Sequence, residues 1–162
     1  KKMKSKTTKK LAMAGVFTAL AVVGSMLSVP VASSKCAPVQ HMINILSAVL
    51  LGPGYSVGIA FVASLLRNIL GLGSFLAFPG SMVGALCCGL VYKFSKKVLP
   101  TCVAEAFGGI AAYPVAKYAM GLQDIGMFVY VVPFLISTVA GSILAFVLVT
   151  AFKKSGVTEF FE

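Results

Sequence analysis

The chain has 162 residues, of which 59% are hydrophobic and only 11% charged, and its net charge is +10. A soluble domain usually carries about 25% charged residues, so this composition excludes an ordinary soluble enzyme or nucleic-acid-binding domain. At about 20 residues per membrane span, the length allows one domain of roughly six transmembrane helices.

Six apolar runs, separated by Gly and Pro, predict an all-α bundle of about six membrane helices. In chain order they cover residues 11–29, 39–51, 55–70, 77–94, 102–120 and 125–152. The first run is uncharged and long for a signal peptide, so we expect a retained helix. The second and third are short, and either cross at a tilt or form a re-entrant pair. We therefore expect a basic segment at 1–10, one membrane domain at 11–152 and a short tail at 153–162.

Lysines cluster at residues 1–10, 93–97 and 153–154, each beside the end of an apolar run. If both termini lie on one side, that side holds 11 of the 14 Lys and Arg residues. The other side then holds Lys35, Arg67 and Lys117. Because positive charge marks the inner side, we predict cytoplasmic termini, with residues 30–38, 67–78 and 119–124 facing outward.

Few side chains could support catalysis. The only histidine is His41, and the acids are Glu105, Asp124, Glu159 and Glu162. Metalloprotease, serine-hydrolase and phosphate-binding motifs are absent, and one histidine is too few for a metal site. We expect no catalytic residue, metal or cofactor, so uphill transport would need an energy-supplying partner. A small intramembrane enzyme using His41 or Glu105 as acid–base, and an autonomous channel, are the alternatives from other classes.

Glu105 and the cysteines have simpler interpretations. Glu105 falls about one turn from the inner end of the fifth run, where reaching the interface or pairing with a lysine is as plausible as function. The cysteines form no Cys-x-x-Cys pair, so we interpret them as small apolar packing residues. They are Cys36, Cys87, Cys88 and Cys102.

Polar residues at the predicted outer ends of three runs form the candidate ligand site. They are Gln40, His41, Asn44, Arg67, Asn68 and Ser81. The three from the second run share one helical face. Such hydrogen-bonding groups, with one cation, suit a small heteroaromatic alcohol better than a metal. Alternatively, Gln40 and His41 cap a helix and Arg67 extends to the interface, whereas Asn44 is costly to bury unpaired, which favours a functional or interhelical role.

Aromatic and small residues add two further features. Tyr113, Tyr118 and Tyr130 form either an interfacial belt or a stacking surface for a ring-shaped ligand.

Small residues recur every four positions in three runs, a spacing that lets helices approach closely. In the run 77–94 one row is Gly80, Gly84 and Cys88, and the adjoining row is Ser81, Ala85 and Gly89. In the run 11–29 one row is Gly15 and Ala19, and the adjoining row is Ala14 and Thr18. The run 125–152 contains Gly141 and Ala145. We favour internal packing for the first row, whereas packing and partner docking are equally compatible with the row from 14 to 19.

Several stretches resemble the substrate-binding S-components of energy-coupling-factor (ECF) transporters, in particular the ThiW-type, thiazole-associated branch. They are KCAPVQHMIN (35–44), AVLLGPGYSVGIAF (48–61), SLLRNILGLG (64–73), FPGSMVGALCCGLVY (78–92) and, more weakly, AEAFGGIAAYPVAKYAMG (104–121). The combination of QHMIN, LLRN and FPGSM carries most of the resemblance.

The resemblance implies a six-helix, multi-pass protein of the bacterial cytoplasmic membrane that binds a vitamin or its precursor without enzymatic activity. It implies two kinds of partner, a membrane coupling protein (the T-component) and two cytoplasmic ATPases. The thiazole branch implies hydroxyethylthiazole, the thiazole half of thiamine, as ligand, with thiamine or another vitamin as the competing assignment.

The resemblance also implies which residues contact ligand and partner. S-components dock the coupling protein through small residues on the first helix, for which the nearest equivalents are Gly15, Ala19, Ala14 and Thr18. Family ligand sites lie near the outer face under the first loop. The expected substrate-binding residues are therefore Gln40, His41, Asn44, Arg67, Asn68, Ser81 and Tyr113.

Overall fold

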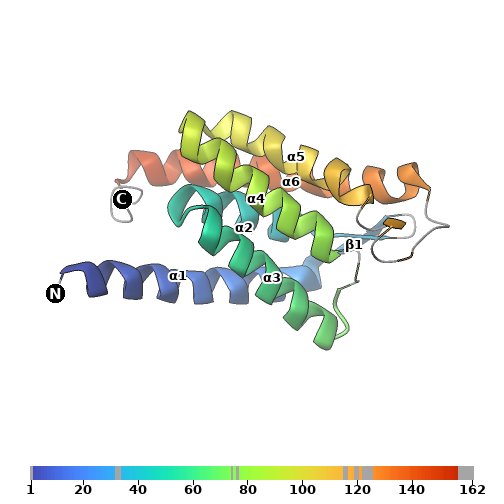
Figure 1. The fold of residues 1–162 in the computed structure, drawn as a ribbon, viewed down its shortest axis with the longest axis horizontal. Helices are drawn as coiled ribbons and strands as arrows, with labels where there is room; N and C mark the ends of the chain where they lie inside the picture. Colours follow the sequence, from blue (N-terminus) through green and yellow to red (C-terminus); the bar gives the residue numbers. More distant parts are fainter. Residues whose placement is uncertain are drawn as a thin grey trace.

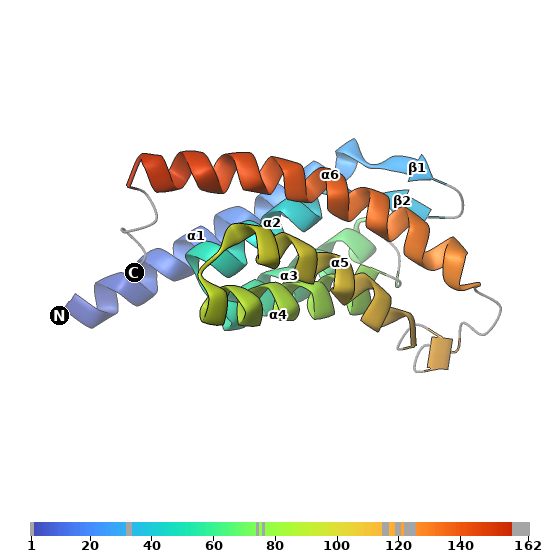
Figure 2. The same ribbon diagram turned by 90° about the horizontal axis from the view of Figure 1, so that it is seen from above.

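The computed structural model describes residues 2–31, 34–73, 75, 77–114, 117–118, 121 and 126–156. These residues form six α-helices and one two-stranded hairpin (Figures 1 and 2). The helices are α1 (Lys2–Gly24), α2 (Pro38–Leu50), α3 (Pro53–Ile69), α4 (Ala77–Ser95), α5 (Val98–Pro114) and α6 (Met127–Lys154). A 3-10 turn (Ser25–Leu27) and strands β1 (Val29–Val31) and β2 (Ser34–Cys36) connect α1 to α2.

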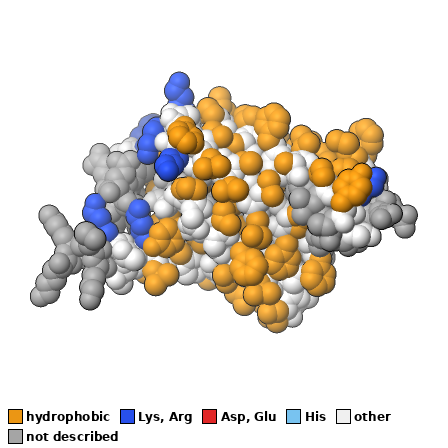
Figure 3. Space-filling view, viewed as in Figure 1, with side chains coloured by type: hydrophobic (Ala, Val, Ile, Leu, Met, Phe, Trp, Pro, Cys, Tyr) orange, Lys and Arg blue, Asp and Glu red, His pale blue; other side chains and the backbone are white. Residues whose placement is uncertain are grey.

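Three stretches of the described helices are long and apolar enough to cross a membrane: Lys6–Leu27, Ala77–Ser95 and Val131–Lys154. Large apolar side chains cover the outside of the bundle, where Phe107 is 63% and Val147 is 61% exposed. Figure 3 shows this apolar surface, with Lys and Arg gathered mainly at the end where α1 begins and α6 ends. Lipid is the solvent that such a surface requires, which confirms the predicted all-α membrane class.

The short α2 is the central helix of the bundle. It has 13 residues, so its length is roughly 20 Å, shorter than the ~30 Å hydrocarbon layer. Nine of its residues are buried, because α2 contacts each of the other five helices. Its apolar side chains, including Ile43, Ile45 and Leu46, pack in the main core with Phe17 of α1 and Val149 of α6.

Several predicted boundaries were wrong, for identifiable reasons. α1 begins at Lys2 instead of residue 11, because lysine is a good helix former and charge alone does not end a helix. α5 begins at Val98 instead of residue 102, because Pro100 lies in its first turn, where proline costs no hydrogen bond. α6 runs from Met127 to Lys154 instead of from 125 to 152. α5 is described as far as Pro114, and the predicted end of this run at residue 120 lies outside the described residues.

The predicted outer loop at 30–38 contains a hairpin that we did not predict. β1 and β2 pair antiparallel, with Val29 opposite Cys36 and Val31 opposite Ser34. The hairpin lies at the end of the bundle opposite the start of α1 (Figure 1). Most of the predicted outer segment at 119–124, the tail from 157 and the side chain of Tyr130 lie outside the described residues.

Glycines allow the closest helix contacts, as predicted for the row along α4. A Cβ added to Gly108 of α5 would collide with the backbone of Gly84 in α4, and one added to Gly89 would collide with Pro53 at the start of α3. Similarly, a Cβ on Gly141 of α6 would lie 2.5 Å from the carbonyl oxygen of Pro38. These glycines therefore serve internal packing.

Replacing Gly108 by Ala is expected to destabilise the bundle, because the backbone of Gly84 can move away only if α4 and α5 separate. Overpacking of this kind costs about 1–3 kcal/mol, so we expect the unfolding temperature in detergent to fall by about 5 °C. Gly58→Ala in α3 is the matched control, since nothing lies within 4 Å of a Cβ there. It should leave the unfolding temperature unchanged or raise it slightly, and equal effects of the two variants would contradict the packing role.

Candidate ligand-binding site

The polar face of α2 points into the bundle. Gln40, His41 and Asn44 are all buried, with exposed fractions of 4%, 6% and 1%. α2 begins with proline in its first turn, and no side chain caps its start. The alternative in which Gln40 and His41 only cap the helix is therefore wrong, and both side chains take part in contacts between helices.

Glu105 of α5 is the centre of the first group of contacts. Its Oε1 atom lies 2.8 Å from Nδ1 of His41 and accepts a hydrogen bond of 2.9 Å from the Asn44 amide. Its Oε2 atom lies 3.1 Å from the Cys88 thiol. With Glu105 ionised, the Nδ1–H group of His41 is the donor, and Thr138 of α6 lies 3.5 Å from the same nitrogen. One carboxylate thus joins α2, α4 and α5.

Glu105 is fully buried, so the interpretation in which it extends to the membrane interface or pairs with a lysine is wrong. A buried carboxylate is tolerated when hydrogen bonds replace its lost hydration, and here three donors surround it. A Cβ on the adjacent Gly84 would lie 2.6 Å from Oε2. Glu105 is therefore enclosed, and its geometry suits holding His41 and Asn44 in place.

A second group of contacts joins α2, α3 and α4. The Ser81 hydroxyl donates to the carbonyl of Ala77 at 2.7 Å, so the 2.9 Å contact between Ser64 and Ser81 uses the Ser64 proton. Gln40 donates to the Ser64 hydroxyl at 3.4 Å, and Asn44 donates to the Ser81 carbonyl at 3.3 Å. Gln40, Asn44 and Ser81 thus belong to one interhelical network.

Arg67 lies one turn beyond Ser64 on α3 and is only 3% exposed. The interpretation in which its side chain extends to the membrane interface is therefore wrong. Two of its nitrogens, Nε and Nη1, are buried without a hydrogen-bond partner among the described residues. A buried unpaired charge costs several kcal/mol, whereas the helix C-terminus recovers at most about 2 kcal/mol. Within the described part of the chain, these two nitrogens thus lack the partners that their burial requires.

The chain that follows α3 helps to bury Arg67. Leu72 and Gly73 donate their backbone N–H groups to the Arg67 carbonyl at 2.8 and 3.0 Å. Gly71 adopts a φ of +70°, which glycine tolerates and which turns the chain back. A Cβ on Gly73 would lie 3.2 Å from the Arg67 Cβ, so the returning chain packs directly on Arg67.

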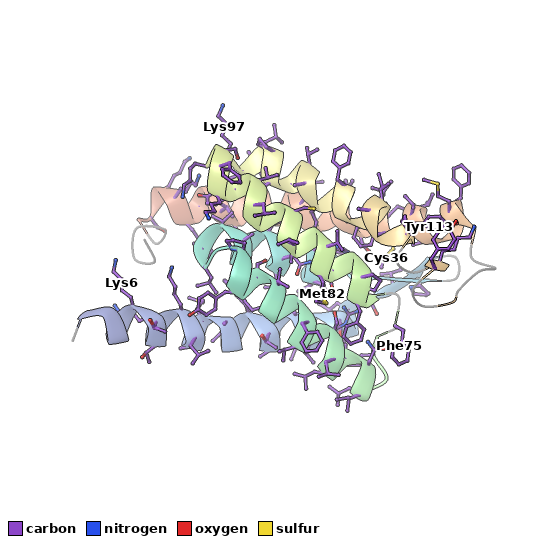
Figure 4. All side chains as sticks on the ribbon, in the orientation of Figure 1. Lys6, Cys36, Phe75, Met82, Lys97 and Tyr113 are labelled. Atoms are coloured by element: carbon purple, nitrogen blue, oxygen red, sulfur yellow. The ribbon has the colours of Figure 1, made fainter. Side chains whose placement is uncertain are left out.

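The two remaining predicted residues, Asn68 and Tyr113, lie on α3 and α5. The Asn68 amide donates to the carbonyl of Ser64 on its own helix at 2.8 Å. Tyr113 is half-buried near the end of α5, whereas Tyr118 is 75% exposed, with the Lys117 ammonium 5.6 Å from its ring. Figure 4 shows Tyr113 and Cys36 at the hairpin end and Lys6 and Lys97 at the opposite end.

The hairpin is attached to α6 at this end. The Cys36 thiol lies 3.3 Å from the carbonyl of Pro133, and the backbone N–H of Ala37 donates to the Ser137 hydroxyl at 2.9 Å. Both contacts link β2 and the start of α2 to the N-terminal half of α6. They fix one side of the hairpin close to the polar face of α2.

Two apolar hollows lie away from the polar networks. One, of about 630 Å³, lies between α1 and α3 and includes Ala14, Gly15, Thr18, Gly54 and Gly58 in its lining. We call it the α1–α3 groove. A Cβ on Gly15, Gly54 or Gly58 would meet nothing within 4 Å, unlike those on α4. These glycines leave open space instead of tight packing. The second hollow, of about 540 Å³, lies between α4 and α5.

Metal binding finds no support in the described part of the chain, where no three His, Cys, Asp or Glu side chains cluster as ligands would. All four cysteines are free. Cys88 is more than an apolar packing residue, since its thiol lies within hydrogen-bonding distance of both Glu105 and the Thr101 carbonyl.

The sequence interpretation missed four residues of the networks, Glu105, Ser64, Cys88 and Thr138. The signal for Ser64 was available, because it precedes Arg67 by one turn on the same helical face. Glu105 and Thr138 are 64 and 97 residues from His41 in the chain, so spacing alone could not pair them.

Together these features define a class, that of integral membrane proteins with an apolar outer surface and a polar, hydrogen-bonded interior. The chain belongs to the ThiW family of thiamine-precursor transporter proteins, whose family model matches residues 11–155. The match confirms the ThiW-type resemblance over nearly the whole chain and identifies the protein as a membrane transporter of a thiamine precursor. No curated protein matches the chain.

Proposed function

We propose that this protein is the S-component of an ECF transporter and captures hydroxyethylthiazole at the hairpin end of the bundle. The observation that carries the proposal is Arg67, which is buried with two hydrogen-bond donors unpartnered among the described residues. A bound ligand would supply the acceptors that these donors lack. Membership of a family of thiamine-precursor transporters supports a thiamine precursor as that ligand, and the resemblance to the thiazole-associated branch implies that it is a thiazole.

Capture would take place at the outer face of the membrane. The helix ends beside the lysine clusters would face the cytoplasm, because positive charge favours that side. The hairpin would then cover the ligand, and Tyr113 would stack on its ring. Gln40, His41, Asn44, Asn68 and Ser81 would form the polar side of the site, with Glu105 holding His41 and Asn44 in position.

The α1–α3 groove would dock the membrane coupling protein, which two cytoplasmic ATPases would drive. Of the four small residues expected at this contact, Ala14, Gly15 and Thr18 line the groove and Ala19 does not. Three glycines that meet no neighbour support docking over internal packing, because a partner helix could approach the backbone closely there.

Calorimetry on the purified protein in detergent tests the function. Hydroxyethylthiazole has about nine heavy atoms, and at a ceiling near −1.5 kcal/mol each its binding cannot exceed roughly −13 kcal/mol. Nanomolar affinity is thus attainable only with near-complete burial. We expect saturable binding at micromolar concentration or tighter. If thiamine or another vitamin binds instead, the thiazole assignment is wrong, and if no vitamin or precursor binds, the S-component proposal is wrong.

Tyr113 and Tyr118 form a matched pair for locating the site. Tyr113→Ala should weaken hydroxyethylthiazole binding at least tenfold, because base-like rings gain about 1–3 kcal/mol from aromatic stacking. Tyr118→Ala removes the same ring from an exposed position and should leave the affinity unchanged. Equal affinities of the two variants would place the site elsewhere.

The alternatives from other classes have less support. An intramembrane enzyme would need an accessible acid–base group, but Glu105 is enclosed by three donors and by Gly84. A channel would need a polar path, whereas Gly84 of α4 lies directly against Gly108 and Glu105 of α5 and leaves no room between these two helices. Ion flux in liposomes that contain this chain alone would support the channel.

A further inference from the structure

The charge on Arg67 has no counter-ion within the described part of the chain. Glu105 is the one acidic residue described there. Its Oε1 accepts from His41 and Asn44, and its Oε2 faces Cys88. The carboxylate is therefore committed to α2 and α4, and Arg67 is left as a separate buried cation.

Neutral groups near Arg67 are also engaged. The Ser64 hydroxyl, one turn earlier, donates to Ser81 and accepts from Gln40, and its carbonyl accepts from Asn68. The carbonyl of Arg67 itself accepts from Leu72 and Gly73. These acceptors already have donors, and none of them bonds to Nε or Nη1 of Arg67.

We propose that Arg67 binds an anionic group on the transported ligand, so that the preferred substrate is a thiazole carrying a phosphate monoester or a carboxylate. This inference rests on the proposed function and narrows its substrate class. The family match fixes the ligand only as a thiamine precursor, which includes both the neutral alcohol and its charged derivatives.

The physical reason is the permanent charge of the guanidinium. Arginine cannot lose its proton in a protein, so burial does not neutralise it as it can neutralise a lysine. Hydrogen bonds from a cation to an anion are shorter and about twice as strong as neutral ones. A phosphate or carboxylate offers several acceptor oxygens to the unpartnered donors, whereas an alcohol offers one.

The test compares three probes by calorimetry on the full protein in detergent: hydroxyethylthiazole, its phosphate monoester and inorganic phosphate. We expect the ester to bind at least tenfold more tightly than the alcohol, and this preference to disappear in Arg67→Gln. Equal binding of ester and alcohol would overturn the inference while leaving the thiazole function intact. Binding of neither thiazole would overturn the function itself. Binding of inorganic phosphate as tight as that of the ester would show a phosphate site without thiazole recognition, and would also overturn the inference.

Two controls separate a bound anion from other causes. Lys117→Gln removes another cation that the sequence places on the outer side of the membrane. This variant should keep the preference for the ester if Arg67 makes the contact. Arg67→Gln should unfold at the same temperature as the unaltered protein or higher, because an unpaired buried charge is removed. If Asp124, which lies outside the described residues, neutralises Arg67, Asp124→Asn will lower the unfolding temperature and the preference for the ester will be absent. That result would overturn the inference.

Discussion

Replacing Glu105 by Ala is expected to lower strongly both the yield of folded protein and its unfolding temperature. The change removes the acceptor of His41 and Asn44 and the neighbour of Cys88, and it opens a cavity between α4 and α5. Breaking a buried hydrogen-bonded network of this kind costs about 3–5 kcal/mol, a large part of the ~5–15 kcal/mol that stabilises a typical domain. Membrane yield and the unfolding temperature in detergent measure the effect.

Glu105→Gln is the matched control for this loss. Glutamine keeps the volume and one acceptor oxygen, but its amide group presents donors to groups that already donate. We expect an unfolding temperature between those of the unaltered protein and Glu105→Ala. In a double-mutant cycle, His41→Ala should cost much less in the Glu105→Ala background than alone, because the two residues share one interaction. Additive effects would show that the pair is not coupled.

The second large effect is expected from Gly15→Leu in the α1–α3 groove. A leucine there would fill space that the proposed coupling protein occupies, so uptake of labelled thiazole should fall to background in cells with a complete transporter. Binding of hydroxyethylthiazole by the purified variant should be unchanged, because a Cβ added to Gly15 would meet nothing within 4 Å. The combination of lost uptake and intact binding distinguishes a docking defect from a folding defect.

Ala12 and Ala19 supply the controls for the groove. Both are exposed on α1 and neither lines the hollow. Ala12→Leu should transport normally. Ala19→Leu tests which face of α1 contacts the partner. Transport close to normal would place the partner over Ala14, Gly15 and Thr18. Normal uptake by Gly15→Leu would exclude the groove as the docking surface.

The fold could be predicted largely because membrane helices follow from uninterrupted apolar runs. The packing role of the α4 glycines also followed from their four-residue spacing. The errors arose where local signals were ambiguous, as at Pro100, which looked like a break but lies in the first turn of α5. This error moved Glu105 too close to the helix end, where an interfacial role seemed as plausible as a buried one.

The candidate site was predictable only in part. The face of α2 identified Gln40, His41 and Asn44, because helical periodicity fixes which side chains point the same way. Their partners come from α3, α4, α5 and α6, and pairs so distant in sequence depend on tertiary packing. The burial of Arg67 depends on the turn at Gly71 and Gly73, which folds the chain back over the helix end.

The enclosure of Glu105 has a consequence for delivery of the ligand. Its bonds join α2, α4 and α5 inside the bundle, so a ligand bound at the hairpin end, as we propose, could pass between these helices only if those bonds broke. We therefore expect the ligand to stay in its binding site while the whole protein reorients within the bilayer and exposes that site to the opposite side.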